Sequence, residues 1–140
     1  VALGGSDLVC LRKIDDYEAN GGPLSALIGG LSSEGSLLVC PCDVPAISAN
    51  GLKQILTRAT DTEAMAVIAK SNRLEPLIGY YNSACLPALV SAWTAGTRAP
   101  KDALKLFDFE TVNLEISEVL NVNRMSDLES AKIQLGLDLP

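Results

Sequence analysis

The chain has 140 residues, 48% of them hydrophobic, and a formal net charge of −6 at pH 7. This length allows one compact domain with a real core, and two domains would be crowded. The acidic balance, the lack of a basic run and a total of only six aromatic residues argue against nucleic acid and an anionic membrane as partners. No apolar stretch is long enough to span a bilayer and nothing resembles a signal peptide, so we expect a cytoplasmic protein.

The first 36 residues predict two short apolar elements, a loop and a helix. Residues 1–3 predict a strand, and residues 8–11 a second strand or the start of a helix. Residues 13–22 are polar and rich in turn formers, which indicates an exposed loop. A helix follows over Pro23 to Ser32. Its N-terminus can receive a phosphate, or it can be an ordinary junction between a loop and a helix.

The run Leu37 to Cys40 predicts a strand buried on both faces, with Asp43 at its end and Pro45 turning the chain away. A carboxylate at the carboxyl end of a strand can hold Mg²⁺ through oxygen, or it can simply start a turn before a helix. Cys40 and Cys42 would face the same side of the strand as small core residues. A structural zinc site would require all four cysteines, because the chain has no histidine.

Helices and strands alternate through the remaining residues, which argues for an α/β sheet open at its edges. A capping residue, a proline or a glycine marks most of the expected boundaries. The expected elements are a helix capped by Ser48 or Asn50 and ending near Ala59, a hairpin of strands 65–69 and 76–81 with its proline at an edge or first position, a helix capped by Asn82 or Ser83 and ended by Gly96, a short helix 101–107, a strand within 111–122 followed by a polar loop, and a last helix from Ser126 to about Leu135.

Three segments taken together resemble one family, the molybdenum cofactor guanylyltransferases and the related cytidylyltransferases. They are Gly22-Pro23-Leu24 opening a helix, residues 38–45 (LVCPCDVP) and residues 120–128 (LNVNRMSDL). Residues 73–77 and 95–98 fall where two further family segments belong. The resemblance implies a Rossmann-like, open, mostly parallel three-layer sheet of the nucleotide-diphospho-sugar transferase type with a hairpin insertion. Residues 1–140 would form a single domain, the C-terminal two-thirds of a nucleotidyltransferase domain.

The same resemblance implies that GMP or CMP is transferred from GTP or CTP to molybdopterin, with release of pyrophosphate and with Mg²⁺ as the cofactor. The competing hypotheses are a non-catalytic binding module that kept the fold, and a nucleotidyltransferase for another phosphorylated substrate. The family's glycine-rich start, with its Arg and Lys, is missing from these residues. We therefore expect a longer protein, and expect the chain alone to lack activity and to self-associate through an unpaired edge of the 37–40 strand.

The resemblance also assigns roles to residues. Asp43 would be the catalytic metal ligand and contact the nucleotide, and Asp15 or, on spacing, Asp16 would lie near the nucleoside. The remaining residues implied to contact the pterin substrate are Gly21, Gly22, Pro23, Asn121 and Asn123. The asparagines can instead stabilise their own loop.

Two anionic reactants also require cations, and the candidates are Arg98, Arg73 and Lys70, with Arg98 assigned to the substrate site. Glu75 occupies a position at which the family usually has histidine.

Overall fold

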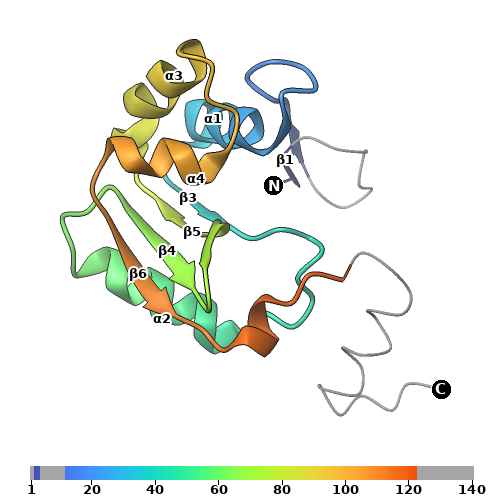
Figure 1. The fold of residues 1–140 in the computed structure, drawn as a ribbon, viewed down its shortest axis with the longest axis vertical. Coiled ribbons are helices and arrows are strands. Elements are labelled where there is room, and N and C mark those ends of the chain that lie inside the picture. Colours follow the sequence, from blue (N-terminus) through green and yellow to red (C-terminus); the bar gives the residue numbers. More distant parts are fainter. Residues whose placement is uncertain (1, 4–11, 123–140) are drawn as a thin grey trace.

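The computed structural model describes residues 2–3 and 12–122, and a four-stranded sheet forms its centre (Figure 1). The order of the strands is β3 (Leu37–Val39), β5 (Leu74–Tyr81), β4 (Ala66–Lys70) and β6 (Phe109–Asn113). β5 is antiparallel to both of its neighbours, while β4 and β6 are parallel. Three strands therefore run in one direction and β5 runs in the other. This confirms an α/β sheet with the predicted hairpin, β4 and β5, and makes the sheet a mixed one in which two of the three strand pairs are antiparallel.

Helices cover both faces of the sheet. Figure 1 shows α1 (Gly22–Glu34), α3 (Leu86–Thr94) and α4 (Pro100–Ala103) on one side and α2 (Ala49–Thr60) on the other. The side chains of β4 alternate between two buried clusters. Ala66 and Ile68 pack with α1 and α3, and Val67 and Ala69 pack with Ile55 of α2. β4 is thus buried on both faces, as the middle layer of the predicted three-layer α/β fold must be.

Two short strands form a separate parallel pair, β1 (Ala2–Leu3) and β2 (Lys13–Ile14), which lies against α1. β1 confirms the strand expected at the start of the chain. β2 lies in a segment that was predicted to be loop, and that prediction is wrong for these two residues. Ile14 is only 7% exposed, so it belongs to the core despite its polar neighbours. The elements predicted over residues 8–11 and from Ser126 onward lie outside the described residues.

The helices begin at the proline and capping residues from which their starts were predicted. Pro23 lies in the first turn of α1, and the Ser48 hydroxyl caps α2 by accepting the Gly51 N–H at 2.8 Å. Asn82 caps a 3₁₀ turn, η1 (Ser83–Cys85), which leads into α3. The short helix expected near residue 101 is shared between α4 and a second 3₁₀ turn, η2 (Leu104–Leu106). No helix within the described residues has the length and apolar character required to cross a membrane.

Two details of the strand predictions are wrong. β3 ends at Val39 and is not buried on both faces, because Leu38 is 38% exposed at the edge of the sheet. Pro76 is not first in its strand, although the side of β5 on which it lies next to β3 is locally unpaired. It lies within β5, where the register to β4 is broken by a bulge and where the three residues of β3 do not reach, so no ladder hydrogen bond is lost.

The last strand also begins earlier than predicted. β6 ends at Asn113, and the chain then forms the 3₁₀ turn η3 (Ile116–Val119) before Asn121. The alternation of apolar and polar residues after Thr111 therefore reflects a short strand and a turn. Leu114, between the two, and Val119, in the turn, both enter the core beside α2.

Candidate functional site

One edge of the sheet gathers the residues that can carry chemistry. Since β3, β4 and β6 run in the same direction, their carboxyl ends meet at this edge, which is where open α/β sheets bind ligands. Asp43 follows β3, Arg73 follows β4 and Asn121 follows β6. Residues that are far apart in the sequence therefore come from three neighbouring loops.

The side chain of Asp43 is held from one side only. The Asn121 amide donates a hydrogen bond to Oδ2 of Asp43 at 2.7 Å, and the Val122 N–H donates to the Asp43 carbonyl oxygen at 2.7 Å. The other carboxylate oxygen, Oδ1, is buried and has no hydrogen-bond partner within the described residues. A buried oxygen without a donor is costly for a carboxylate, so this atom is suited to a ligand that the protein itself does not supply.

The free oxygen of Asp43 fits a hard cation such as Mg²⁺. This ion prefers oxygen ligands, keeps several waters and is usually bound through one or two carboxylates together with substrate phosphates. The described residues hold no group of three or more His, Cys, Asp or Glu side chains able to form a complete metal cage. Asp43, oriented by Asn121, can therefore supply one oxygen ligand to a magnesium ion whose other ligands are water or a bound phosphate.

The two cysteines before Asp43 do not lie in the core, and the prediction that they do is wrong. Cys40 and Cys42 are both exposed, because β3 ends at Val39 and the alternation of a strand no longer applies to them. Partial desolvation raises the pKa of the Cys40 thiol, and the nearby Asp43 carboxylate and Cys42 thiol raise it further. A thiol with a raised pKa is a poor nucleophile at neutral pH, so catalysis through Cys40 is disfavoured.

A hollow of about 160 Å³ opens at the same edge of the sheet, beside Asn121. The turn between β4 and β5 and the segment after β6 form its two walls. It is lined by Asn72, Arg73, Glu75, Ile116, Val119, Leu120 and Asn121. Arg73 donates its Nε–H to Oε1 of Glu75 at 2.8 Å. Since Asn121 lines the hollow and also bonds Asp43, the hollow and the carboxylate belong to one site.

A second group of predicted residues lies on the loop between β2 and α1. The buried hydroxyl of Ser25 anchors this loop by accepting the Glu18 N–H at 2.7 Å and donating to the Glu18 carbonyl at 2.9 Å. Asp15 is exposed and Asp16 is partly buried. Oδ1 of Asp16 is buried without a hydrogen-bond partner in the part of the chain that the structure describes. Asp16, the carboxylate preferred from spacing, is thus the better candidate of the two for holding a ligand.

The start of α1 confirms the loop-to-helix junction predicted at Gly21, Gly22 and Pro23. Gly21 is the N-terminal cap residue and offers no side-chain acceptor, and Gly22 has a φ of 77°, which favours glycine. A side chain at Gly21 would come within 2.7 Å of Cη2 of Trp93. The first N–H groups of the helix therefore remain without a side-chain cap, next to the loop that carries Asp16.

Arg98, predicted to contact the substrate, packs against Trp93. Its guanidinium lies 3.8 Å from the centre of the Trp93 ring and donates to the Trp93 and Thr97 carbonyl oxygens at 2.9 and 3.0 Å. The Trp93 indole N–H in turn donates to Glu18 at 2.6 Å, and Tyr17 meets the ring edge to face. Trp93 therefore joins α3 to the acidic loop, and Arg98 packs on Trp93 within the second group of residues.

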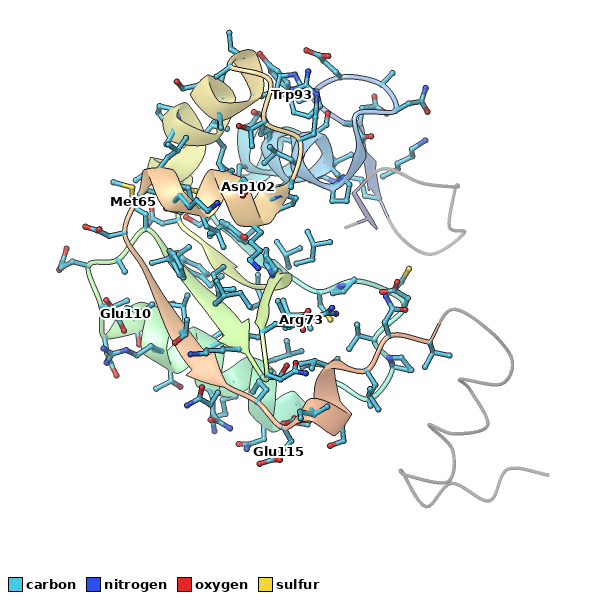
Figure 2. All side chains as sticks on the ribbon, in the orientation of Figure 1. Met65, Arg73, Trp93, Asp102, Glu110 and Glu115 are labelled. Carbon is cyan, nitrogen blue, oxygen red and sulfur yellow. The ribbon has the colours of Figure 1, made fainter. Side chains whose placement is uncertain are left out.

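The structure thus divides the predicted site residues into two groups. Asp43 and Asn121 lie together, and Asp16, Gly21 and Arg98 lie on or beside the loop that precedes α1. No hydrogen bond or ion pair between the two groups is found within residues 12–122. Asn123 lies outside the described residues. Figure 2 shows Trp93 of the second group well separated from Arg73 of the first.

Sequence reasoning missed the two interactions that shape these groups. The bond between Glu18 and Trp93 joins residues 75 positions apart, and nothing in the local pattern announces it. The pair Arg73 and Glu75 had a signal, because residues two apart at the start of a strand share a face and opposite charges there attract. Noting that spacing would have placed a fixed guanidinium at the hairpin end.

The amino-acid sequence is similar to a known protein family and to named members of it. Residues 6–111 match the family model described as MobA-like NTP transferase domain. A probable molybdenum cofactor guanylyltransferase of Flavobacterium johnsoniae is 31% identical over 135 residues, covering 93% of this chain and 71% of that protein. A molybdenum cofactor guanylyltransferase of Pseudomonas syringae pv. syringae is 31% identical over 130 residues, covering 91% of this chain and 62% of that protein.

Solved structures share the fold. The crystal structure of molybdopterin-guanine dinucleotide biosynthesis protein A from Archaeoglobus fulgidus superimposes with a TM-score of 0.74 at 21% identity, covering 89% of this chain and 68% of that one. A putative protein from Aquifex aeolicus gives a TM-score of 0.65 at 19% identity, covering 80% and 62%. At these identities the likeness concerns the fold alone.

Proposed function

Because the chain belongs to the MobA-like NTP transferase domain family, a family of nucleotidyltransferases, we propose that it transfers GMP, or CMP, from the nucleoside triphosphate to molybdopterin. The observation that carries the proposal is the carboxylate of Asp43, which lies at the carboxyl edge of the sheet with one oxygen bonded to Asn121 and the other buried without a partner. The names of the curated relatives favour guanine as the base. The chain spans 71% and 62% of the length of these two relatives, so the activity of the whole protein is part of what we propose.

In the proposed reaction, a phosphate oxygen of the acceptor attacks the α-phosphorus of the triphosphate. A new phosphorus–oxygen bond forms, the bond to the bridging oxygen breaks, and pyrophosphate leaves with that electron pair. Little covalent chemistry is required of the protein, whose work is alignment and neutralisation of charge. Asp43 would hold Mg²⁺, which supplies Lewis acidity to the phosphates. Asn121 fixes the orientation of the carboxylate by its bond to Oδ2.

The proposal predicts that, in the full-length protein, Asp43→Asn weakens Mg²⁺-dependent binding of GTP by at least about tenfold, equivalent to ~1.4 kcal/mol, while the fold persists. The amide has nearly the volume of the carboxylate but no charge to hold the cation. Isothermal titration calorimetry with GTP and with CTP, in Mg²⁺ and in EDTA, measures the effect and also compares the two bases.

Asp61→Asn is the matched control, because Asp61 is an exposed residue at the far end of α2 and should leave nucleotide binding unchanged. Equal affinities of wild type and Asp43→Asn for magnesium GTP would refute the role of Asp43. Tight GTP binding without any transfer to molybdopterin would instead favour the binding module.

A further inference from the structure

We propose that Arg73, positioned by Glu75, binds the phosphate of the acceptor substrate in the hollow beside Asn121. The proposal rests on the proposed function, since it names the group that recognises the phosphorylated acceptor. Three cations were candidates from the sequence, and the structure separates them. Arg98 is stacked on Trp93 and bonded to two carbonyl oxygens, and Lys70 is not among the residues that line the hollow. Among the described residues, Arg73 alone brings a positive charge to it.

The guanidinium of Arg73 is held in place while part of it remains available. Its Nε–H is used by Glu75, whose side chain is only 16% exposed, whereas the side chain of Arg73 is 71% exposed. Within residues 12–122, neither Nη1 nor Nη2 makes a hydrogen bond of its own. The two Nη groups of a fixed, planar guanidinium match two oxygens of a phosphate.

The backbone beneath Arg73 is also fixed. The Ser71 N–H donates to the Arg73 carbonyl at 3.0 Å and closes the tight turn between β4 and β5. Glu75, the second residue of β5, is in register with Ala69 of β4. Arg73 therefore projects from the end of a hairpin in the middle of the sheet, and Glu75 limits the rotamers that its side chain can adopt.

The opposite wall suits the organic part of the acceptor. Ile116, Val119 and Leu120 supply apolar surface, and Ile116 remains 54% exposed. The hollow, at about 160 Å³, is smaller than the roughly 300–1,000 Å³ of sites that enclose a whole small molecule. It can therefore hold one end of a ligand, with an apolar face against η3 and an anionic group on Arg73. An organic phosphate monoester has this composition.

An ordinary surface ion pair is the competing explanation, and the chain contains one for comparison. Arg58 and Glu110 also form an ion pair, with side chains 48% and 33% exposed, but they join α2 to β6 away from the hollow. Exposed pairs of this kind contribute little to stability. The pair Arg73 and Glu75 differs because its carboxylate is largely buried and its arginine lines a hollow that also contains Asn121, the hydrogen-bond partner of Asp43.

The test compares 6-hydroxymethylpterin phosphate with 6-hydroxymethylpterin by calorimetry, using the full-length protein. We expect the wild type to prefer the phosphate ester and Arg73→Ala to lose about tenfold or more of its affinity for the ester alone. Arg73→Lys should retain part of the preference, because it keeps the charge without the planar fork. Arg58→Ala, the matched control, should retain all of it.

Variants of Glu75 separate positioning from stability. Glu75→Gln keeps an acceptor for the Nε–H and removes a negative charge, so it should bind the ester at least as tightly as wild type. Glu75→Ala loses the acceptor and should bind it more weakly. A purely structural role for Glu75 predicts instead that ester affinity follows the melting temperature in both variants.

Two outcomes would overturn the inference: a wild type that does not distinguish the ester from the pterin, or an Arg73→Ala protein that keeps the distinction. Binding of magnesium GTP is measured on the same samples, so the two proposals fail separately. If Arg73→Ala binds GTP normally and still prefers the ester, the role of Arg73 is refuted and the proposed function is unaffected. If the wild type binds no nucleotide but prefers the ester, and Arg73→Ala loses that preference, the phosphate site is supported and the nucleotidyltransferase proposal is refuted.

Discussion

Single atoms with no partner distinguish the candidate site from the rest of the described chain. Oδ1 of Asp43 and Oδ1 of Asp16 are the buried side-chain oxygens or nitrogens without a hydrogen-bond partner within residues 12–122. Buried polar atoms are nearly always paired, so each such atom calls for an explanation. Both belong to residues that the sequence resemblance assigned to nucleotide and metal binding. A ligand that supplies the missing partner explains both atoms.

The buried thiol of Cys85 makes stability depend on alkaline pH. Burial raises its pKa to about 11 from an ordinary value of 9.0. Between these values the unfolded chain has lost the thiol proton while the native chain keeps it. The native state then binds more protons, so the free energy of unfolding falls as pH rises, by at most ~1.4 kcal/mol per pH unit, and this term is absent below about pH 9.

Replacing Cys85 with Ala should therefore reduce the loss of stability between pH 9 and pH 10, although it lowers stability at both values by creating a cavity. Urea unfolding at each pH measures the difference. Cys42→Ala is the control, because Cys42 is exposed and contributes only the smallest of the three causes that raise the pKa of Cys40, so the slope should stay close to that of wild type. Burial is the main cause of the raised pKa of the neighbouring Tyr81 and acts in all three proteins, whereas the smaller contribution from the Cys85 charge is lost in Cys85→Ala. A Cys85→Ala slope equal to that of wild type would contradict the assignment.

Among the elements, α1 shows how a helix positions the acidic loop. Gly29 lies on the buried face of α1, and a Cβ at this position would overlap the Asp15 carbonyl oxygen and come within 3.0 Å of the Tyr17 nitrogen. Ser25, one turn earlier, is bonded to both polar backbone groups of Glu18. The loop that carries Asp16 therefore depends on a small residue and a hydroxyl at consecutive turns of the helix.

Gly29→Ala should displace this loop and destabilise the protein by about 1–3 kcal/mol, despite the better helix propensity of alanine. Trp93 is the only tryptophan of the chain and contacts the loop through Tyr17 and Glu18, so its fluorescence should change as well. Chemical denaturation followed by fluorescence measures both effects. Ser33→Ala, on the exposed side of the same helix, is the control and should change stability by less than ~0.5 kcal/mol. A stabilised Gly29→Ala protein with wild-type fluorescence would show that the loop does not rest on Gly29.

Local sequence signals predicted where helices and strands lie better than they predicted the burial and contacts of the residues within them. Pro23, Ser48 and Asn82 fixed the starts of α1, α2 and η1, because capping depends on neighbours within one turn. The burial of Leu38 and Cys40 was predicted wrongly, because it depends on whether another element covers the edge of the sheet and on where the strand ends. Arg98 could not be placed from sequence, because its position follows from the distant Trp93 ring.

For the molecule as a whole, the sheet brings three loops together at the carboxyl ends of its parallel strands and leaves the outer side of its terminal strand, β3, uncovered by another described strand. β5 alone runs against the other strands, so the ends of β3, β4 and β6 converge on Asp43, Arg73 and Asn121. The order of the strands also places β3 at one end of the sheet, and none of the described strands pairs with its outer side. Within residues 2–3 and 12–122, the N–H and C=O groups on the outer side of this short apolar strand therefore have no strand partner.

An unpaired apolar edge favours pairing between chains, so we expect self-association that increases with protein concentration. Leu38 is 38% exposed on this strand, and Leu38→Lys should weaken the association by placing like charges side by side, while changing stability by less than ~0.5 kcal/mol. Sedimentation velocity over a range of concentrations measures the effect. Leu106→Lys is the control, because Leu106 is 56% exposed in η2, outside the sheet. If association is non-specific and hydrophobic, Leu106→Lys should weaken it at least as much as Leu38→Lys. If it depends on pairing at the edge of β3, only Leu38→Lys should weaken it. A wild-type chain that stays monomeric at every concentration would mean that the outer edge of β3 is already satisfied within the protein.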